Sequence, residues 1–348
     1  MRQQRRLLLL ASATALAIAG AAYVTLRGPG APPESGIGQR LYPELGLRLD
    51  EVARVAIQRA DSSFTLTRNE GEWRNPEKFD HPVAFERVRK LLLEIADLRT
   101  IETRTASPAQ YAALEIEPGS APDAKSTQVT LKDAGGAEIA SLIVGKQRFG
   151  RGGPAGDGTY VRKAAEAQSW LVRGRLGVER EAVRWLERKP LEVGRERVRE
   201  AVTVQADAKR LVVRRAQPGE PDFAIVDPPA ERKTKPAYEL NGLGGVLDGL
   251  EFDDVRPAAG VPFPASGAPP GAHAEISTFD GLIVRAELAQ HEGATWVRFT
   301  ARAATPAPAE EIAKEALEIN RRVAPWVYRL PDWRTDLLRR KLDDLLEG

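Results

Sequence analysis

The residue types that carry most covalent and metal chemistry are scarce in this 348-residue sequence, which has no cysteine and three histidines. Without cysteine, disulfides, Cys-ligated zinc, iron–sulfur clusters and thiol nucleophiles are excluded. His81, His273 and His291 lie far apart in the chain and follow no metal-ligand or catalytic-triad spacing. We interpret them as isolated capping or surface residues.

Adjacent carboxylates and one glycine-rich segment are the other patterns that could serve catalysis or phosphate binding. The acid pairs are Asp253-Asp254, Glu310-Glu311 and Asp343-Asp344. Neighbouring residues on a helix or strand point in different directions, so these pairs indicate solvated charges and not the two acids of a hydrolase. The glycine-rich segment 147–158 precedes a strand pattern, whereas a phosphate cradle precedes a helix, so it indicates a hairpin loop. We therefore predict no catalytic residue, no metal site and no cofactor, and a protein that is not an enzyme.

The overall composition is that of a folded protein with nearly balanced charge. Lys and Arg number 51 against 49 Asp and Glu, which gives a formal net charge of +2, and 42% of the residues are hydrophobic. Nucleic-acid-binding domains usually carry a marked basic excess, so we expect no nucleic-acid partner.

The N-terminal region has the pattern of a membrane anchor. Residues 7–26 carry no charge, and a helix of this length spans about 30 Å, the thickness of a bilayer core. Arg2, Arg5 and Arg6 precede it, which predicts a cytoplasmic N-terminus and an exported body. We predict a signal anchor over 1–27 in a bacterial inner membrane, a flexible spacer over 28–40 and a periplasmic body. The small residues around Ala17-Ile18-Ala19 leave a cleaved signal peptide as the alternative.

Two parts of the exported body resemble each other. VARVAIQ at 52–58 matches REAVTVQ at 199–205, and later a Thr-aromatic-Val-Arg sequence recurs at 159–162 and 295–298. Each part alternates apolar and polar residues along its strand patterns and contains one amphipathic helix pattern. In the first helix the apolar face is Val88, Leu91, Leu92, Ile95 and Leu98, and in the second it is Leu243, Leu247 and Leu250.

These patterns predict an α+β fold in which an N-terminal transmembrane helix is followed by two duplicated, mostly antiparallel β modules, each with a packed helix. The first repeat covers 41–175, a connecting helix and linker cover 176–195, and the second repeat covers 196–302. A C-terminal helical segment follows at 303–348 and ends in an amphipathic helix.

Five residues are candidates for binding a partner. Arg162 and Arg298 occupy matching positions after Tyr-Val and Trp-Val, so they either line a groove for an anionic group or form ion pairs on a solvated face. Trp326, Tyr328 and Trp333 lie in the C-terminal segment and are of the types that anchor interfaces. The alternative is that this segment packs back onto the second repeat.

Several stretches together resemble the DUF4340 family. They include LYPELGLRLDEVARVAIQ, GEWRNPEKFDHPVAFERVRKLLLEIADLRTIET, TASPAQYAALEIEP, GTYVRKAAEAQSWLVRGRL and WVYRLPDW. The resemblance extends from about Leu41 to the C-terminus. It implies a membrane-anchored bacterial envelope protein of undetermined activity, often encoded beside an ABC transporter of the gliding-motility type, and it carries over no active-site residue.

Together these observations lead us to expect a non-enzymatic envelope protein that serves as an accessory component of an ABC-type transport complex, with transporter subunits as its partners. A periplasmic module that binds a ligand or glycan is the alternative. A hydrolase with an unrecognised site is the third possibility.

Overall fold

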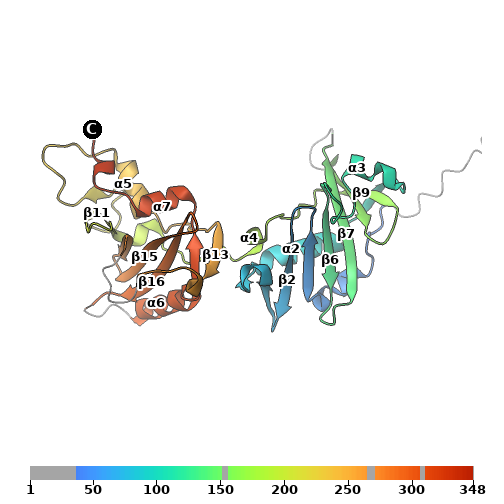
Figure 1. Ribbon diagram of the computed structural model, residues 1–348, viewed down its shortest axis with the longest axis horizontal. Coiled ribbons are helices and arrows are strands. Elements are labelled where there is room, and N and C mark those ends of the chain that lie inside the picture. The colour runs from blue at the N-terminus through green and yellow to red at the C-terminus, as the bar shows by residue number, and fades with distance from the viewer. Residues whose placement is uncertain (1–36, 151–155, 265–270, 306–309, 348) are drawn as a thin grey trace, which may run out of the picture. The chain divides into compact units, whose positions relative to one another are not determined.

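The computed structural model describes residues 37–150, 156–264, 271–305 and 310–347 (Figure 1). The predicted signal anchor and most of the predicted spacer lie outside these described residues. Within the described ranges, no helix is long and apolar enough to cross a membrane.

The architecture is α+β, with two mostly antiparallel sheets and several helices, as predicted (Figure 1). By their backbone contacts the described residues form two compact units. The first comprises 37–52, 58–61 and 91–177, and the second comprises 53–57, 62–90 and 178–347.

The first sheet has the strand order β4-β3-β2-β1-β6-β7-β8-β9-β5. Its strands are β1 (Arg54–Gln58), β2 (Ser63–Asn69), β3 (Glu72–Asn75), β4 (His81–Pro82), β5 (Thr100–Thr103), β6 (Thr127–Lys132), β7 (Glu138–Arg148), β8 (Gly158–Lys163) and β9 (Ser169–Arg173). Helix α2 (Phe85–Ala96) follows β4, and α3 (Tyr111–Leu114) lies between β5 and β6. The predicted apolar face of α2 is buried from Val88 to Leu98, so this prediction is confirmed.

The second sheet has the strand order β12-β11-β10-β14-β15-β16-β17-β13 and lies wholly in the second unit. Its strands are β10 (Val198–Val204), β11 (Arg210–Arg214), β12 (Ala224–Ile225), β13 (Asp254–Pro257), β14 (His273–Thr278), β15 (Leu282–His291), β16 (Ala294–Ala303) and β17 (Trp326–Arg329). Its helices are α5 (Ala237–Gly244), α6 (Glu310–Val323) and α7 (Asp332–Leu338), and α4 (Ala182–Trp185) precedes the sheet. Among the described residues, short 3₁₀ segments lie at Leu45–Leu47, Leu49–Glu51, Pro76–Lys78, Pro108–Gln110, Arg195–Arg197, Ala258–Gly260 and Asp343–Leu345.

The two sheets share one topology. When the two-residue strand β4 is set aside, the first sheet reads β3-β2-β1-β6-β7-β8-β9-β5 and the second reads β12-β11-β10-β14-β15-β16-β17-β13. Each strand of the second sheet therefore occupies the place of the strand with the same rank in the first, and β17 takes the place of β9. Thus Trp326–Arg329, predicted within a helical segment beyond the second repeat, forms a sheet strand.

The predicted helix containing Leu243, Leu247 and Leu250 is only partly present. Helix α5 ends at Gly244, where a second glycine follows, and glycine is a poor helix former. Leu247 lies in a turn beyond the helix and Leu250 directly after that turn, and both are fully buried. The prediction of burial is confirmed, whereas the predicted extent of the helix is wrong.

The final amphipathic helix is also shorter than predicted. It ends at Leu338, and a separate 3₁₀ turn covers Asp343–Leu345. The carboxylate of Asp344 accepts a hydrogen bond from the backbone N–H of Lys341 at 2.8 Å. Such local side-chain bonds compete with helical hydrogen bonding. The leucines of this segment are nevertheless buried, at Leu337, Leu338, Leu345 and Leu346.

Helices cover the inner face of the second sheet. Helix α6 packs along β16 through Ile312, Ala316, Ile319 and Val323, which recur at helical spacing and are buried (Figure 1). The Asn320 amide bonds both backbone groups of Ala301 at 2.7–2.8 Å, which fixes the helix against the strand. The outer face of the same strands is left for polar residues.

Candidate partner interface on the second sheet

Strands β14, β15 and β16 place their residues alternately on the two faces of the second sheet. The inward positions are buried and apolar: Ala274, Ile276, Leu282, Val284, Ala286, Phe299 and Ala301. The outward positions include Glu275, Arg285, Glu287, Arg298, Thr300 and Arg302. We call these six residues the outer face.

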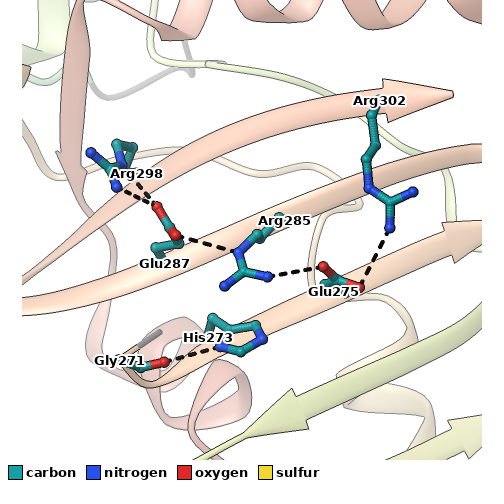
Figure 2. A network of polar contacts seen from close by, with 7 residues as sticks. All are labelled: Gly271, His273, Glu275, Arg285, Glu287, Arg298 and Arg302. Carbon is teal, nitrogen blue, oxygen red and sulfur yellow. Dashed lines mark hydrogen bonds and ion pairs between the residues drawn. The ribbon is translucent and has the colours of Figure 1, made fainter. Parts of the chain in front are cut away.

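Five of these residues form one chain of ion pairs across the three strands (Figure 2). Arg298 donates through Nε and Nη2 to one oxygen of Glu287, at 2.8 and 2.6 Å. The other oxygen of Glu287 lies 3.3 Å from Nε of Arg285. Arg285 in turn donates from Nη1 to Glu275 at 3.1 Å, and Arg302 lies 3.8 Å from the second oxygen of Glu275. Each carboxylate is therefore shared by two arginines.

The strand register explains this arrangement. Arg298 lies directly opposite Glu287 in the β15–β16 pair, and Arg285 lies directly opposite Glu275 in the β14–β15 pair. Opposite charges in such cross-strand positions attract each other. The side chains remain between about a quarter and three fifths exposed, so each pair contributes less than about 1 kcal/mol. The main effect of the network is therefore to fix the positions of the charged side chains on the outer face, and its contribution to the stability of the fold is small.

An aromatic cluster borders the outer face at one end. Trp296 packs with Val261 and Val327, and Phe263 lies against them. The guanidinium of Arg298 stacks on the Phe263 ring at 4.6 Å, and that of Arg256 stacks on the Trp296 ring at 4.9 Å. Val261 and Phe263 belong to the proline-containing segment that follows β13, and the described part of this segment covers the Trp296 end of the face.

The corresponding region of the first sheet is covered in a related way. Tyr160 of β8 packs with Tyr111 and Ile116, which belong to the segment between β5 and β6. Arg104 stacks on Tyr160 at 5.2 Å, and Arg162 stacks on Tyr111 at 4.5 Å. In both sheets an arginine therefore stacks on the strand aromatic, and a second arginine stacks on the ring of the covering segment.

The matching arginines Arg162 and Arg298 nevertheless have different surroundings. Arg162 is 5% exposed and donates to the carbonyl oxygens of Ile116, Ala164 and Glu166 at 3.0–3.3 Å. Arg298 is half-buried and pairs with the carboxylate of Glu287. Arg298 thus forms an ion pair on a solvated face, one of the two alternatives that the sequence left open. Arg162 instead donates hydrogen bonds to backbone carbonyls inside the first unit.

The three candidate aromatics of the C-terminal segment do not form one surface. Tyr328 is 1% exposed, and burial raises the pKa of its phenol. Trp326 is half-buried, and Trp333 is 56% exposed with the Arg334 guanidinium stacked on it at 4.2 Å. Only Trp333 is open to a partner, and the leucines around it pack back onto the second unit.

The interpretation of the histidines as capping or surface residues is wrong for two of the three. His81 and His273 are 5% and 6% exposed. His81 lies between the rings of Phe252 and Trp326 in the second unit, with centroids at 5.4 and 4.8 Å. Nδ1 of His273 lies 3.0 Å from the Gly271 carbonyl oxygen (Figure 2). His273 lies on the same side of β14 as Glu275, opposite Glu287, and is nevertheless buried.

Two further buried arginines hold loops in place, Arg215 and Arg334. Arg334 donates to the carbonyls of Gly245, Val246, Asp248 and Gly249, the turns that follow α5. Arg215 bonds four carbonyls in the same manner and stacks on Phe223. Burial lowers the pKa of both guanidinium groups. No sequence signal marks them, because their acceptors are backbone atoms.

A separate pocket of about 550 Å³ lies between the β10–β11 turn and the C-terminal turn. Its polar lining includes Gln205, Asp207, Lys209, Arg210, Lys341 and Asp343. Within the part of the chain that the structure describes, no group of three or more histidine or acidic residues is placed to hold a metal ion.

Comparison with known proteins places the chain in a family. The family model described as "Domain of unknown function (DUF4340)" matches residues 73–266, just over half of the chain. No curated protein matches the sequence.

Proposed function

The chain belongs to the DUF4340 family, and on this premise we propose that it is a non-enzymatic, membrane-anchored protein of the bacterial cell envelope that serves as an accessory component of an ABC-type transport complex. The proposal combines the uncharged run at 7–26, which has the length of a membrane span, with a body whose polar groups suit contact with another protein.

The outer face is the observation that carries the partner-binding part of the proposal. It is a sheet surface with its charges ordered by cross-strand pairs and with an arginine-stacked aromatic cluster at its edge. Interfaces between proteins are enriched in arginine and aromatic residues, and their charges complement those of the partner.

The finer features of the fold also belong to this proposal. We take the body to be a duplicated module, because the two sheets share one strand order and the same two arginine–aromatic stacks. The module is tethered by an N-terminal transmembrane helix whose flanking arginines keep the N-terminus cytoplasmic.

A periplasmic ligand-binding module is the second candidate. It is favoured by the pocket of about 550 Å³, whose volume lies in the range of small-molecule sites. Its lining combines side chains of both charges with the apolar side chains of Ala206, Leu211 and Leu342.

Site-specific photo-crosslinking in the native host tests the leading proposal. A photoreactive amino acid replaces Thr300, which is exposed at the centre of the outer face, and in a matched control it replaces Leu317, which is exposed on α6. Crosslinked products are identified by mass spectrometry. We expect a transporter subunit to be captured from position 300 and not from 317.

Capture of a soluble periplasmic protein alone, or equal capture from both positions, would refute the transporter role. A reporter that is active only outside the cytoplasm, fused at the C-terminus, tests the export separately. Release of the protein by alkaline extraction of membranes would contradict the tether.

A further inference from the structure

The outer face has more positive than negative charge. Across β10, β11, β14, β15 and β16, the residues on this side of the sheet include five arginines and three glutamates: Arg210, Arg214, Arg285, Arg298, Arg302, Glu200, Glu275 and Glu287. Glu200 pairs with Arg214. The outer face itself has three arginines and two glutamates, an excess of one positive charge.

The hydrogen-bonding capacity of the face is just as unequal. Both oxygens of Glu275 and both oxygens of Glu287 already meet arginine nitrogens. Arg302 makes only the 3.8 Å contact with Glu275, which is too long for a hydrogen bond, and its side chain is 58% exposed. Among the described residues its guanidinium donates no hydrogen bond. Among the described residues, one oxygen of Glu275 likewise accepts no hydrogen bond, since its contact with Arg302 is too long. The outer face therefore has more unused N–H donors than unused carboxylate oxygens, which suits a ligand that supplies negatively charged acceptors.

The shape of the face favours a polypeptide over a small anion. Neighbouring strands lie about 4.8 Å apart, so the charged residues of β14 to β16 extend about 10 Å across the sheet. From Arg298 to Arg302 they extend about 13 Å along β16. A carboxylate or phosphate alone would meet one arginine, whereas an extended acidic segment could meet several.

The edge of the face supplies an apolar contact beside the charges. Phe263 lies over Arg298 and remains partly exposed, so it can contact a side chain that follows the acidic residues. Binding proteins commonly combine arginine with aromatic residues in this way.

We infer that the outer face of the second sheet binds an acidic, extended segment of a protein partner, with Arg302 as the principal free cation and Arg285 and Arg298 in support. The inference deepens the proposed function, because it assigns a chemical class to the partner of that same surface.

The test is fluorescence anisotropy of a labelled oligo-glutamate peptide with the full chain in a mild detergent. Arg302→Glu is compared with Arg89→Glu, whose arginine is equally exposed at 56% and also neighbours one glutamate. We expect Arg302→Glu to weaken binding about tenfold, since it removes a contact and adds repulsion, and Arg89→Glu to bind like the wild type. Binding to the wild type should weaken with added salt.

Thr300→Asp is the second variant, because it adds negative charge at the centre of the face without removing any ion pair. It should also weaken peptide binding, and circular dichroism checks that both variants are folded. Equal peptide binding by the wild type and all three variants would overturn the inference.

Two other outcomes would also overturn it. Arg302-dependent binding of phosphatidylglycerol vesicles without binding of the peptide would assign the face to a lipid surface. Self-association that Arg302→Glu abolishes would assign it to a second copy of the chain. Crosslinking from position 300 to a transporter subunit is a separate measurement. The peptide assay can therefore refute binding of an acidic segment without refuting the transporter role, and the crosslinking can refute the transporter role alone.

Discussion

Buried His81 makes the stability of this protein dependent on pH. Its ring is enclosed by Phe252 and Trp326, and Nδ1 lies 3.0 Å from the carbonyl oxygen of Pro82, to which it donates. Burial, assisted by the nearby positive charge of Arg74, lowers the pKa of His81 from 6.5 to about 4. The folded protein therefore keeps the imidazole neutral over a range in which the unfolded chain binds a proton.

The sign and the size of the effect follow from this difference in pKa. Above pH 6.5 both states are neutral at His81 and the full stability is present. As the pH falls from 6.5 towards 4, the unfolded state takes up the proton first and stability is lost. At 1.36 kcal/mol per pKa unit, the loss attributable to His81 is about 2 kcal/mol at pH 5 and reaches about 3 kcal/mol below pH 4.

Urea unfolding followed by tryptophan fluorescence at pH 7 and pH 5 measures this loss. His81→Asn serves as the comparison, because the asparagine amide can donate to Pro82 as Nδ1 does but does not titrate. The variant is less stable at both pH values, since it loses ring contacts, so the quantity compared is the change between them. We expect the wild type to lose about 2 kcal/mol more than the variant. An equal loss in both proteins would refute a neutral, buried His81.

Three further predictions concern packing, and each is measured by chemical or thermal unfolding of the full chain. Arg334→Met should lower the free energy of unfolding by about 3 kcal/mol, because it leaves buried carbonyls unpaired; an effect below about 1 kcal/mol would show that water replaces the guanidinium. Ile95→Ala and Leu247→Ala, both at sites 1% exposed, should each cost about 2–5 kcal/mol, and a loss at only one of them would contradict equivalent core roles. Gly244→Ala places a Cβ in steric overlap with the Phe223 ring and should cost about 1–3 kcal/mol, whereas unchanged stability would mean that the ring can move.

The main part of the fold is predictable because its strands and first helix repeat a simple apolar pattern. The face of α2 from Val88 to Leu98 is buried as the spacing requires. β17 is not predictable in this way, because four residues between two helices are too few to reveal an alternation. Helix α5 ends at the consecutive glycines Gly244 and Gly245. The leucine spacing continues past them, so it predicts a longer helix than the one that forms.

The candidate interface was accessible to sequence reasoning only in part. Arg298 stands out because it matches Arg162, but its partners Glu275, Arg285 and Glu287 come together through the register of two hairpins. The usable signal was the alternation of charged and apolar residues in three consecutive strand patterns, which places all the charges on one face. The sequence could not reveal which of the two matching arginines is buried, because that depends on the covering segment.

The different environments of Arg162 and Arg298 indicate why the second sheet, and not the first, offers the more promising surface. In the first unit the segment containing Tyr111 and Ile116 supplies a stacking ring and also a carbonyl, so Arg162 needs no carboxylate and is removed from solvent. In the second unit Phe263 supplies the ring, and the charge of Arg298 is met by Glu287, which Arg285 shares. Because Arg285 and Arg298 share the carboxylate of Glu287, neither positive charge is fully neutralised. The network has three arginines for two glutamates, and the guanidinium of Arg302, at its end, is exposed to solvent. The covering segment of the first unit therefore buries Arg162, whereas that of the second unit leaves Arg298 on an exposed, positively charged face.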